Sequence, residues 1–194
     1  RRARHTLAQD EIGDLLIAEA RAGNTVVRLK GGDPFIFGRG GEEVDAALAA
    51  GVPVHVVPGI SAANGAAAST LMPLTHRDHA SMVSFVAGEC RGLAEQNWAG
   101  LAGKGRTLVI YMGLAGAAPI AEKLMADGLA PDTPVAVIER ATQVNERLVT
   151  SLLADLAGLV EREAIASPAL IIVGDVAALP AARAKLKETT CLVC

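Results

Sequence analysis

Five short loops, each directly after a predicted strand, hold the residues best suited to bind a ligand. The loops are Gly31-Gly32-Asp33, Pro58-Gly59-Ile60-Ser61, Met112-Gly113, Arg140-Ala141-Thr142 and Gly174-Asp175. Glycine lets a backbone approach a ligand closely, and the Asp33 carboxylate accepts hydrogen bonds of the kind that a ribose hydroxyl or an ammonium group donates. Because ligands of open parallel sheets bind outside the carboxyl ends of the strands, this placement predicts one crevice for a small molecule. Gly31-Gly32-Asp33-Pro34 taken alone fits a simple tight turn equally well.

Cationic side chains gather at or next to these loops, although the whole chain has a formal net charge of -3. They are Arg28, Lys30, Arg39, His76, Arg77 and Arg140. Arginine offers paired donors in a planar fork, so such a cluster suits an anionic small molecule with several carboxylates. The alternative, that these charges are solvated loop residues, stays open at this point.

Several other chemistries lack the residues that they need. Gly38-Arg39-Gly40-Gly41 does not extend to a dinucleotide-binding glycine motif, because position 43 is Glu. Gly59-Ile60-Ser61-Ala62-Ala63 resembles a nucleophile elbow without its last glycine, so a hydrolase is not predicted. The His76-Arg77-Asp78-His79 segment has no further ligand at metal-site spacing, and we expect a hinge or surface role rather than a metal site.

The three cysteines, Cys90, Cys191 and Cys194, are an odd number and form no disulfide framework. We interpret Cys90 as an ordinary small residue and the terminal C-x-x-C as an inert tail. A reduced, cytoplasmic location is therefore expected.

The composition is that of a soluble α/β protein. Of 194 residues, 51% are hydrophobic and only 3% are aromatic, so the core must consist of small and branched aliphatic side chains. No overall positive charge is available to hold nucleic acid or an anionic membrane. Residues 46–75 contain no Asp, Glu, Lys or Arg, but prolines and glycines divide them into pieces shorter than the ~20 apolar residues of a membrane span. We expect neither a nucleic-acid nor a membrane partner.

Hydrophobic periodicity predicts alternating strands and helices. Helices are expected at residues 7–22, 41–50, 61–69, 117–127 and 152–163. Strands are expected at residues 25–29, 54–57, 82–86, 107–111, 135–138, 147–150 and 170–173. A capping box of Thr6 and Gln9 starts the first helix. Because a parallel crossover needs room for a helix, this order predicts parallel pairing in an α/β architecture. The polar residues 75–79 indicate an N-terminal α/β domain, 1–76, and a C-terminal α/β domain, 77–194.

Residues 27–43, which read VRLKGGDPFIFGRGGEE, resemble the characteristic segment of the uroporphyrinogen-III C-methyltransferases in the tetrapyrrole methylase family. Four further segments match in the same order: Val57–Ala62, Pro73–Arg77, Tyr111–Gly113 and Pro168–Gly174. The resemblance covers essentially the whole chain. It implies a two-domain tetrapyrrole methylase fold, with parallel or mixed sheets, flanking helices and a cleft between the domains for S-adenosylmethionine. It also implies a homodimer.

The resemblance implies methylation of uroporphyrinogen III at C-2 and C-7, giving precorrin-2 for sirohaem or cobalamin. The methyl donor would then contact Gly31, Gly32, Asp33, Ile36, Ser61, Ala62, Met112 and Ala141. Several of these contacts would use backbone groups, and Ala141 stands where many relatives carry Gly. The tetrapyrrole carboxylates would bind Arg28, Arg39, His76 and Arg77. The family's first strand, and the acidic residue and Lys assigned to proton transfer or substrate handling, would lie before Arg1, so no catalytic residue is predicted within the chain.

Two alternatives stay open. The chain could be another member of the family, such as a precorrin methylase or a methylase of diphthamide or ribosomal RNA, and the mass of the product separates these. It could instead be a fragment that binds the donor or dimerises without chemistry, which binding without turnover would identify.

Overall fold

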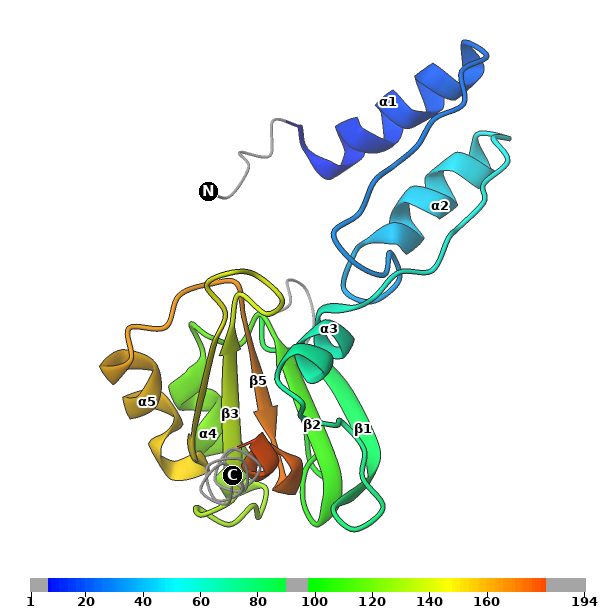
Figure 1. Cartoon of the computed structure of the whole chain (residues 1–194). Helices are drawn as coiled ribbons and strands as arrows, with labels where there is room; N and C mark the ends of the chain where they lie inside the picture. Colours follow the sequence, from blue (N-terminus) through cyan, green and yellow to red (C-terminus); the bar gives the residue numbers. More distant parts are fainter. Residues whose placement is uncertain (1–6, 90–97, 181–194) are drawn as a thin grey trace, which may run out of the picture. The chain divides into compact units, whose positions relative to one another are not determined.

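The computed structural model describes residues 7–89 and 98–180 of the chain (Figure 1). The chain divides into two compact units, Arg1–Ser61 and Ala62–Cys194, here called unit 1 and unit 2. The domain boundary at residue 76 stays a prediction. Thr6 of the capping box and the three cysteines lie outside the described residues.

The described part of unit 1 contains two helices, both close to their predicted positions. Helix α1 is Gln9–Arg21 and helix α2 is Gly40–Ala49. At the start of α1, the Ala8 N–H donates to Glu11 Oε2 at 2.6 Å, which satisfies one of the backbone donors that a helix start leaves free. Gly23 follows α1 with φ of 88°, a left-handed conformation that glycine adopts readily and that ends helices.

The two strands predicted in unit 1 are wrong. Residues 25–29 and 54–57 lie in irregular connections and pair with no strand in the part of the chain that the structure describes. Their β-branched residues fit a strand, but a strand also needs a neighbour to complete its hydrogen bonds. Val27, Leu29 and Val57 are consequently 80%, 84% and 70% exposed.

The described part of unit 2 is built on a five-stranded sheet with the strand order β1-β2-β5-β3-β4. Figure 1 shows β3, β5, β2 and β1 side by side in this order. The strands are β1 Ala80–Ala87, β2 Gly105–Tyr111, β3 Pro134–Glu139, β4 Arg147–Leu152 and β5 Ala169–Val173. The helices are α3 Ala62–Ser69, α4 Ala117–Ala126 and α5 Leu156–Arg162, with 3₁₀ turns at Leu153–Asp155 and Asp175–Ala178. All five strands and all three helices predicted for this part of the chain are confirmed, although α5 starts later than expected because β4 and a 3₁₀ turn come first.

The predicted parallel pairing holds for only one pair of neighbours. β1 and β2 are parallel, whereas β5 is antiparallel to both β2 and β3, and β4 is antiparallel to β3. The helix-containing connection from β2 to β3 does join strands of the same direction, as expected for a crossover. However, β5 enters between these two strands from the other direction, so the sheet is mixed.

The core of unit 2 lies on both faces of this sheet. Neighbouring residues of a strand point to opposite faces, so Leu108 and Ile110 belong to one buried cluster and Val109 and Tyr111 to the other. The first cluster includes side chains of α4 and α5. The second includes Ala63 and Ala66 of α3, together with Val176 and Ala177 of the 3₁₀ turn after β5. The sheet is therefore covered on both faces. Within the described ranges, none of the helices combines the length and apolar character that a bilayer span needs.

Candidate functional site

Two of the predicted loops, residues 31–33 and 58–61, touch each other in unit 1. A Cβ atom on Gly59 would lie 2.7 Å from the Gly32 carbonyl oxygen, and one on Gly32 would lie 3.2 Å from the Ile60 carbonyl oxygen. The same Gly32 position is 3.8 Å from the Cα atom of Ser61. The two backbones thus meet at a separation that only glycine allows at position 59.

Asp33 fastens these two loops together. Its Oδ1 accepts the Phe35 N–H at 2.9 Å, and its Oδ2 accepts the Gly59 N–H at 3.0 Å. Each carboxylate oxygen has a second lone pair, so Asp33 retains capacity for a donor from a ligand. Its predicted role as a ligand acceptor fits this geometry and stays a prediction.

The chain after Asp33 folds back over Pro34 to begin α2. The Gly40 N–H donates to the Pro34 carbonyl oxygen at 2.9 Å. A Cβ atom on Gly38 or Gly40 would lie 2.7 or 2.5 Å from that oxygen, so both positions require glycine. Ile36, at the tip of this turn, is 37% exposed.

Strained backbone gathers at the predicted loops. Among the described residues other than glycine, seven have positive φ, and five of them lie in these loops or in the turn that leads from Asp33 to α2: Phe37, Arg39, Met112, Arg140 and Thr142. Their φ angles lie between 49° and 68°, in the left-handed region. Such conformations cost on the order of 1 kcal/mol each and persist where the surroundings fix them, often at functional sites.

Met112 and Ala141 lie at one edge of the sheet in unit 2. β1, β2 and β3 share one direction, so the residues that follow them, Gly88, Met112 and Arg140, come to the same edge. A Cβ atom on Gly88 would lie 2.4 Å from the Gly113 Cα atom, so the ends of β1 and β2 are in contact. Sequence reasoning missed Gly88, although a glycine directly after a strand is the signal that identified the other loops.

Helix α3 joins this edge of unit 2. The Ala63 N–H, in the first turn of α3, donates to the buried Tyr111 hydroxyl oxygen at 3.0 Å. A Cβ atom on Gly65 would lie 3.3 Å from Thr142 Cγ2. These contacts hold the start of α3 beside the loops that follow β2 and β3. The role of Tyr111 as an acceptor was not predicted, because only the fold brings position 63 to it.

The predicted place of the Gly174-Asp175 loop is wrong. β5 is antiparallel to β2 and β3, so its carboxyl end lies at the opposite edge of the sheet. There the Gly174 N–H donates to the Pro134 carbonyl oxygen at 3.0 Å, and a Cβ atom on Gly174 would lie 2.6 Å from the Arg106 carbonyl oxygen. The loop closes the sheet instead of joining the other loops.

The predicted donor contacts therefore form two groups. Unit 1 brings together Gly31, Gly32, Asp33, Ile36 and Ser61. Unit 2 brings together Ala62, Met112 and Ala141. In both groups the loops expose backbone at glycine or at strained positions, which suits a ligand that is recognised mainly by backbone N–H and C=O groups.

The cations of unit 1 that were predicted to bind substrate have acidic partners. The Glu43 side chain is only 9% exposed. Its Oε1 lies 3.2 Å from Arg28 Nε, and its Oε2 lies 3.0 Å from Lys30 Nζ. Arg39 pairs with Glu42 at 2.5 Å. Arg28 and Arg39 would have to exchange these partners for substrate carboxylates, and their substrate-binding role stays a prediction.

The cations of unit 2 differ from one another. Arg140 Nη2 lies 2.8 Å from a carboxylate oxygen of the buried Glu139. His76 Nδ1 accepts the Asp78 N–H at 3.2 Å, and its backbone forms a bridge with Ala80. Arg77 is exposed and makes no ion pair with any described residue. Among the predicted substrate-binding arginines, Arg77 is thus the one whose guanidinium is not already paired with a described carboxylate.

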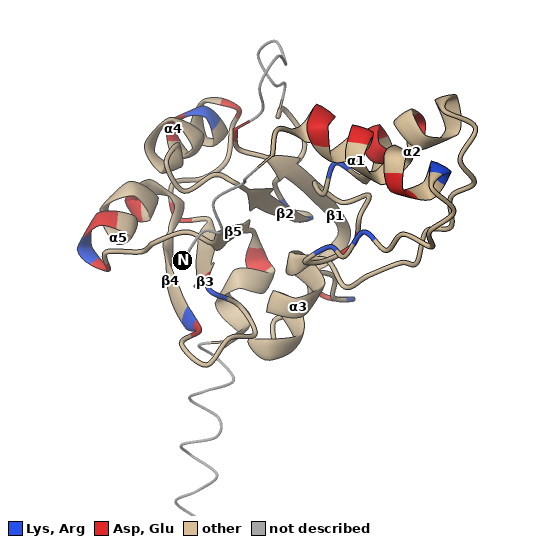
Figure 2. Cartoon of the chain, turned by 90° about the horizontal axis from the view of Figure 1, so that it is seen from above, with Lys and Arg blue, Asp and Glu red and all other residues tan. Residues whose placement is uncertain are grey.

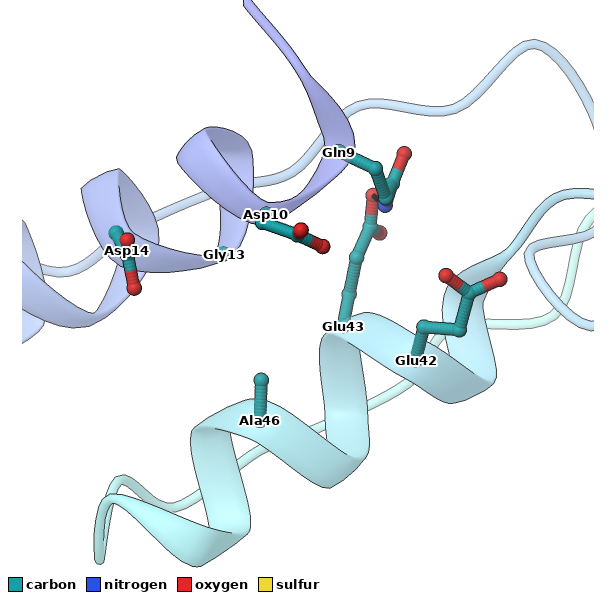
Figure 3. A pocket seen from close by; sticks show the side chains of 7 residues that line it. All are labelled: Gln9, Asp10, Gly13, Asp14, Glu42, Glu43 and Ala46. Atoms are coloured by element: carbon teal, nitrogen blue, oxygen red, sulfur yellow. Dashed lines mark hydrogen bonds between the residues drawn. The ribbon is translucent and has the colours of Figure 1, made fainter.

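A hollow of about 170 Å³ lies between α1 and α2 of unit 1 (Figure 3). It is lined by Gln9, Asp10, Gly13, Asp14, Glu42, Glu43 and Ala46. The acidic side chains come from both helices, as the red segments of α1 and α2 in Figure 2 also show. No predicted site residue lines this hollow, and its negative charge does not suit a carboxylate-rich substrate.

The protonation of Glu43 makes the stability of this helix pair depend on pH. Burial by itself raises the pKa of Glu43, but hydrogen bonds from Lys30 and Gln9, with the charges of Lys30 and Arg28, outweigh it and hold the pKa below the ordinary value of 4.5. Gln9 Nε2 donates to Glu43 Oε1 at 3.0 Å, and the two side chains point toward each other in Figure 3. A carboxylate with a lowered pKa stabilises the folded state above its unfolded pKa, and this stabilisation is lost as the pH falls through the folded pKa.

We therefore predict a difference in acid sensitivity between the wild-type protein and Glu43→Gln. As the pH falls below about 4.5, the free energy of unfolding should decrease more steeply for the wild type, because only its Glu43 must take up a proton. Urea unfolding of both proteins between about pH 7 and pH 3 measures this. Parallel curves for the two proteins would contradict the predicted contribution of Glu43.

Among the described residues, no group of three or more His, Cys, Asp and Glu side chains has the arrangement of a metal site. The rings of His76 and His79 lie 4.8 Å apart and are tilted by 48°. The pair belongs to the turn between α3 and β1.

The mixed sheet with flanking helices, and the glycine-rich or strained loops at the carboxyl ends of three strands, define an α/β protein whose loop backbone is suited to a small ligand. Residues 1–157 match the family model of the Tetrapyrrole (Corrin/Porphyrin) Methylases. The chain belongs to this family, and the predicted resemblance is confirmed.

Individual relatives agree with this assignment. Siroheme synthase of Edwardsiella ictaluri is 52% identical over 175 residues, which are 90% of this chain and 38% of that protein. The uroporphyrin-III C-methyl transferase of Thermus thermophilus complexed with S-adenyl homocysteine is 40% identical, with a TM-score of 0.77 over 88% of this chain and 75% of that one. A cobalt precorrin-4 methyltransferase, a cobalamin biosynthetic enzyme, is 26% identical with a TM-score of 0.80 over 90% of this chain and 74% of that one. The predicted α/β fold class with a mixed sheet is thereby confirmed.

The chain spans less than two fifths of the length of this siroheme synthase and of the siroheme synthase of Gluconacetobacter diazotrophicus.

Proposed function

We propose that the chain binds S-adenosylmethionine and C-methylates uroporphyrinogen III at C-2 and C-7, giving precorrin-2 for sirohaem or cobalamin biosynthesis. The observation that carries this proposal is the 40% identity, with a matching fold, to a uroporphyrin-III C-methyl transferase that was solved with S-adenyl homocysteine. The 52% identity to a siroheme synthase points to the same chemistry. A cytoplasmic homodimer is part of the proposal.

The residues of the chain fit the proposed donor. Gly32 and Gly59 bring two loop backbones together, and Asp33 keeps lone pairs available at their junction. At the sheet edge of unit 2, the Ala141 N–H donates no hydrogen bond to a described residue and is available to a ligand. Met112 is 52% exposed directly after β2. These groups are suited to hold a ligand with both donor and acceptor atoms.

The reaction requires no covalent nucleophile from the protein. S-adenosylmethionine supplies a methyl group on a sulfonium, so transfer is a displacement that depends on the alignment of carbon, methyl and sulfur. The loop residues would fix that alignment and exclude water from it. This accounts for a site built from glycine, Asp33 and backbone groups, without a nucleophile and base pair.

The mass of the product tests the proposed activity. The full chain is incubated with S-adenosylmethionine and uroporphyrinogen III, and we expect a product that carries two added methyl groups. Unchanged uroporphyrinogen III, together with methylation of a later precorrin supplied in a parallel incubation, would favour the precorrin methylase alternative, toward which the 26% identical neighbour points. Donor binding without any transfer would favour the donor-binding fragment.

Arg77 supplies a prediction for substrate recognition. Arg77→Ala should raise the KM for uroporphyrinogen III about tenfold, because a guanidinium bond to a carboxylate contributes about 1.5 kcal/mol or more. The Kd of S-adenosylhomocysteine should stay at the wild-type value. Lys123→Ala, which removes a cation of α4 that pairs with Asp127, is the matched control and should change neither quantity. Equal weakening of donor and substrate by Arg77→Ala would count against a role in substrate binding.

A further inference from the structure

Glu139 is a buried carboxylate to which the proposed function assigns no role. It is the last residue of β3 and is 2% exposed. One carboxylate oxygen lies 2.8 Å from Arg140 Nη2, and the other lies 3.1 Å from Arg147 Nη1. Arg147 begins β4 and stands directly opposite Glu139 in the β3–β4 register. A buried carboxylate that is charge-paired on both oxygens is held in one orientation, and removing its charge takes the ion-pair partner from Arg140 and leaves Arg147 with Glu163.

The two arginines are at the two ends of the loop that joins β3 to β4, residues 140–146. Arg140 is its first residue, and Arg147 follows its last one. Arg147 is itself anchored, since its Nη2 donates to the Glu163 carbonyl oxygen at 3.0 Å and to Glu163 Oε2 at 3.1 Å. Glu139 therefore connects the start of the loop to a fixed point outside it.

The first three residues of this loop, Arg140–Thr142, form the turn whose backbone Glu139 can hold in place. Arg140 and Thr142 have φ of 49° and 68°, so Ala141 lies between two strained residues. The Thr142 N–H donates to Glu146 Oε2 at 2.6 Å, which closes the loop on itself. Backbone strain of this kind persists only when the surroundings fix it, and the Glu139–Arg140 pair joins the first residue of the turn to a buried carboxylate at the end of β3.

We propose that Glu139 is a positioning residue, which holds the Arg140–Thr142 turn in its strained form through Arg140 and Arg147 and so orients the Ala141 backbone for the methyl donor. The proposal rests on the proposed function, which places Ala141 against the donor. Glu139 itself is buried and touches no ligand. Its effect passes entirely through the loop.

The test compares Glu139→Gln with the wild type in two measurements on the full chain. Calorimetric titration of S-adenosylhomocysteine should give a Kd about tenfold higher for the variant, because a charge-assisted pair is replaced by a neutral one. Hydrogen exchange of the donor-free protein should be faster at the amides of residues 142–146 in the variant. The KM for uroporphyrinogen III should not change. Asp155→Asn, which breaks the exposed Asp155–Arg162 pair in the same unit, is the control and should match the wild type throughout.

A second variant keeps the test decisive if Glu139→Gln fails to fold. Arg140→Met leaves the Glu139–Arg147 pair in place, and we expect a folded protein whose donor Kd is raised at least threefold. A donor Kd at the wild-type value in a folded Glu139→Gln protein, or in Arg140→Met, would overturn the proposal. If the wild type binds no donor while Glu139→Gln still accelerates exchange in the loop, the proposed function fails and the positioning of the loop stands.

Discussion

Replacing Asp33 with Ala should weaken the binding of S-adenosylhomocysteine about 30-fold or more. The carboxylate accepts the Phe35 and Gly59 N–H groups, so it ties the two loops of unit 1 together. It is also the proposed acceptor for a donor group of the ligand. A hydrogen bond to a charged group contributes about 2 kcal/mol, and tenfold in Kd corresponds to about 1.4 kcal/mol. Calorimetric titration of the wild type and the variant measures the change.

Asp45→Ala is the matched control for this prediction. Asp45 is an exposed carboxylate on α2 of the same unit, and alanine is favourable in a helix. The control should bind S-adenosylhomocysteine with the wild-type Kd. A wild-type Kd in Asp33→Ala as well would show that the loop junction is not part of the donor site.

Replacing Gly88 with Ala should lower the free energy of unfolding by about 3 kcal/mol. The new Cβ atom would lie 2.4 Å from the Gly113 Cα atom and 3.0 Å from the Gly113 nitrogen, and both are backbone atoms that cannot turn away. The Gly88 N–H also donates to the Tyr111 carbonyl oxygen, so the end of β1 cannot move without losing this bond. Overpacking of this kind costs about 1–3 kcal/mol, and contacts with backbone fall at the upper end.

Chemical denaturation measures this loss, and Gly116→Ala provides the comparison. A Cβ atom on Gly116 would lie 3.6 Å from Ile120 Cδ1, an ordinary contact, so this variant should cost about 1 kcal/mol or less. In Gly88→Ala the donor Kd should also rise, because Met112 directly precedes the glycine that must shift. Equal stabilities of the two variants would contradict the close approach of β1 and β2 at this edge.

Much of unit 2 could be predicted from local sequence. Alternation places Leu108 and Ile110 on one face of β2, and Val109 and Tyr111 on the other, which fixes a strand covered on both faces. The order of the strands could not be predicted, since β5 is inserted between β2 and β3 by pairing between residues far apart in the chain. For the same reason the Gly174 loop was assigned to the wrong edge.

The candidate site shows the same division. Glycines after strands indicated the loops, and the structure brings 31–33 together with 58–61, and Met112 to the same edge as Ala141. The ionic partners of the arginines were not predicted. Arg39 and Glu42 are three residues apart at a helix start, a spacing that sequence reasoning can use. The Glu139–Arg147 pair depends on the β3–β4 register and becomes visible only in the fold.

The measurement that tests the central claim most directly is a crystal structure of the full chain with S-adenosylhomocysteine. We expect the bound molecule to contact the backbone of Gly31–Asp33 and of Ala62, Met112 and Ala141. Binding at any other place, such as the acidic hollow between α1 and α2, would contradict the account. So would a structure without bound ligand at a saturating concentration.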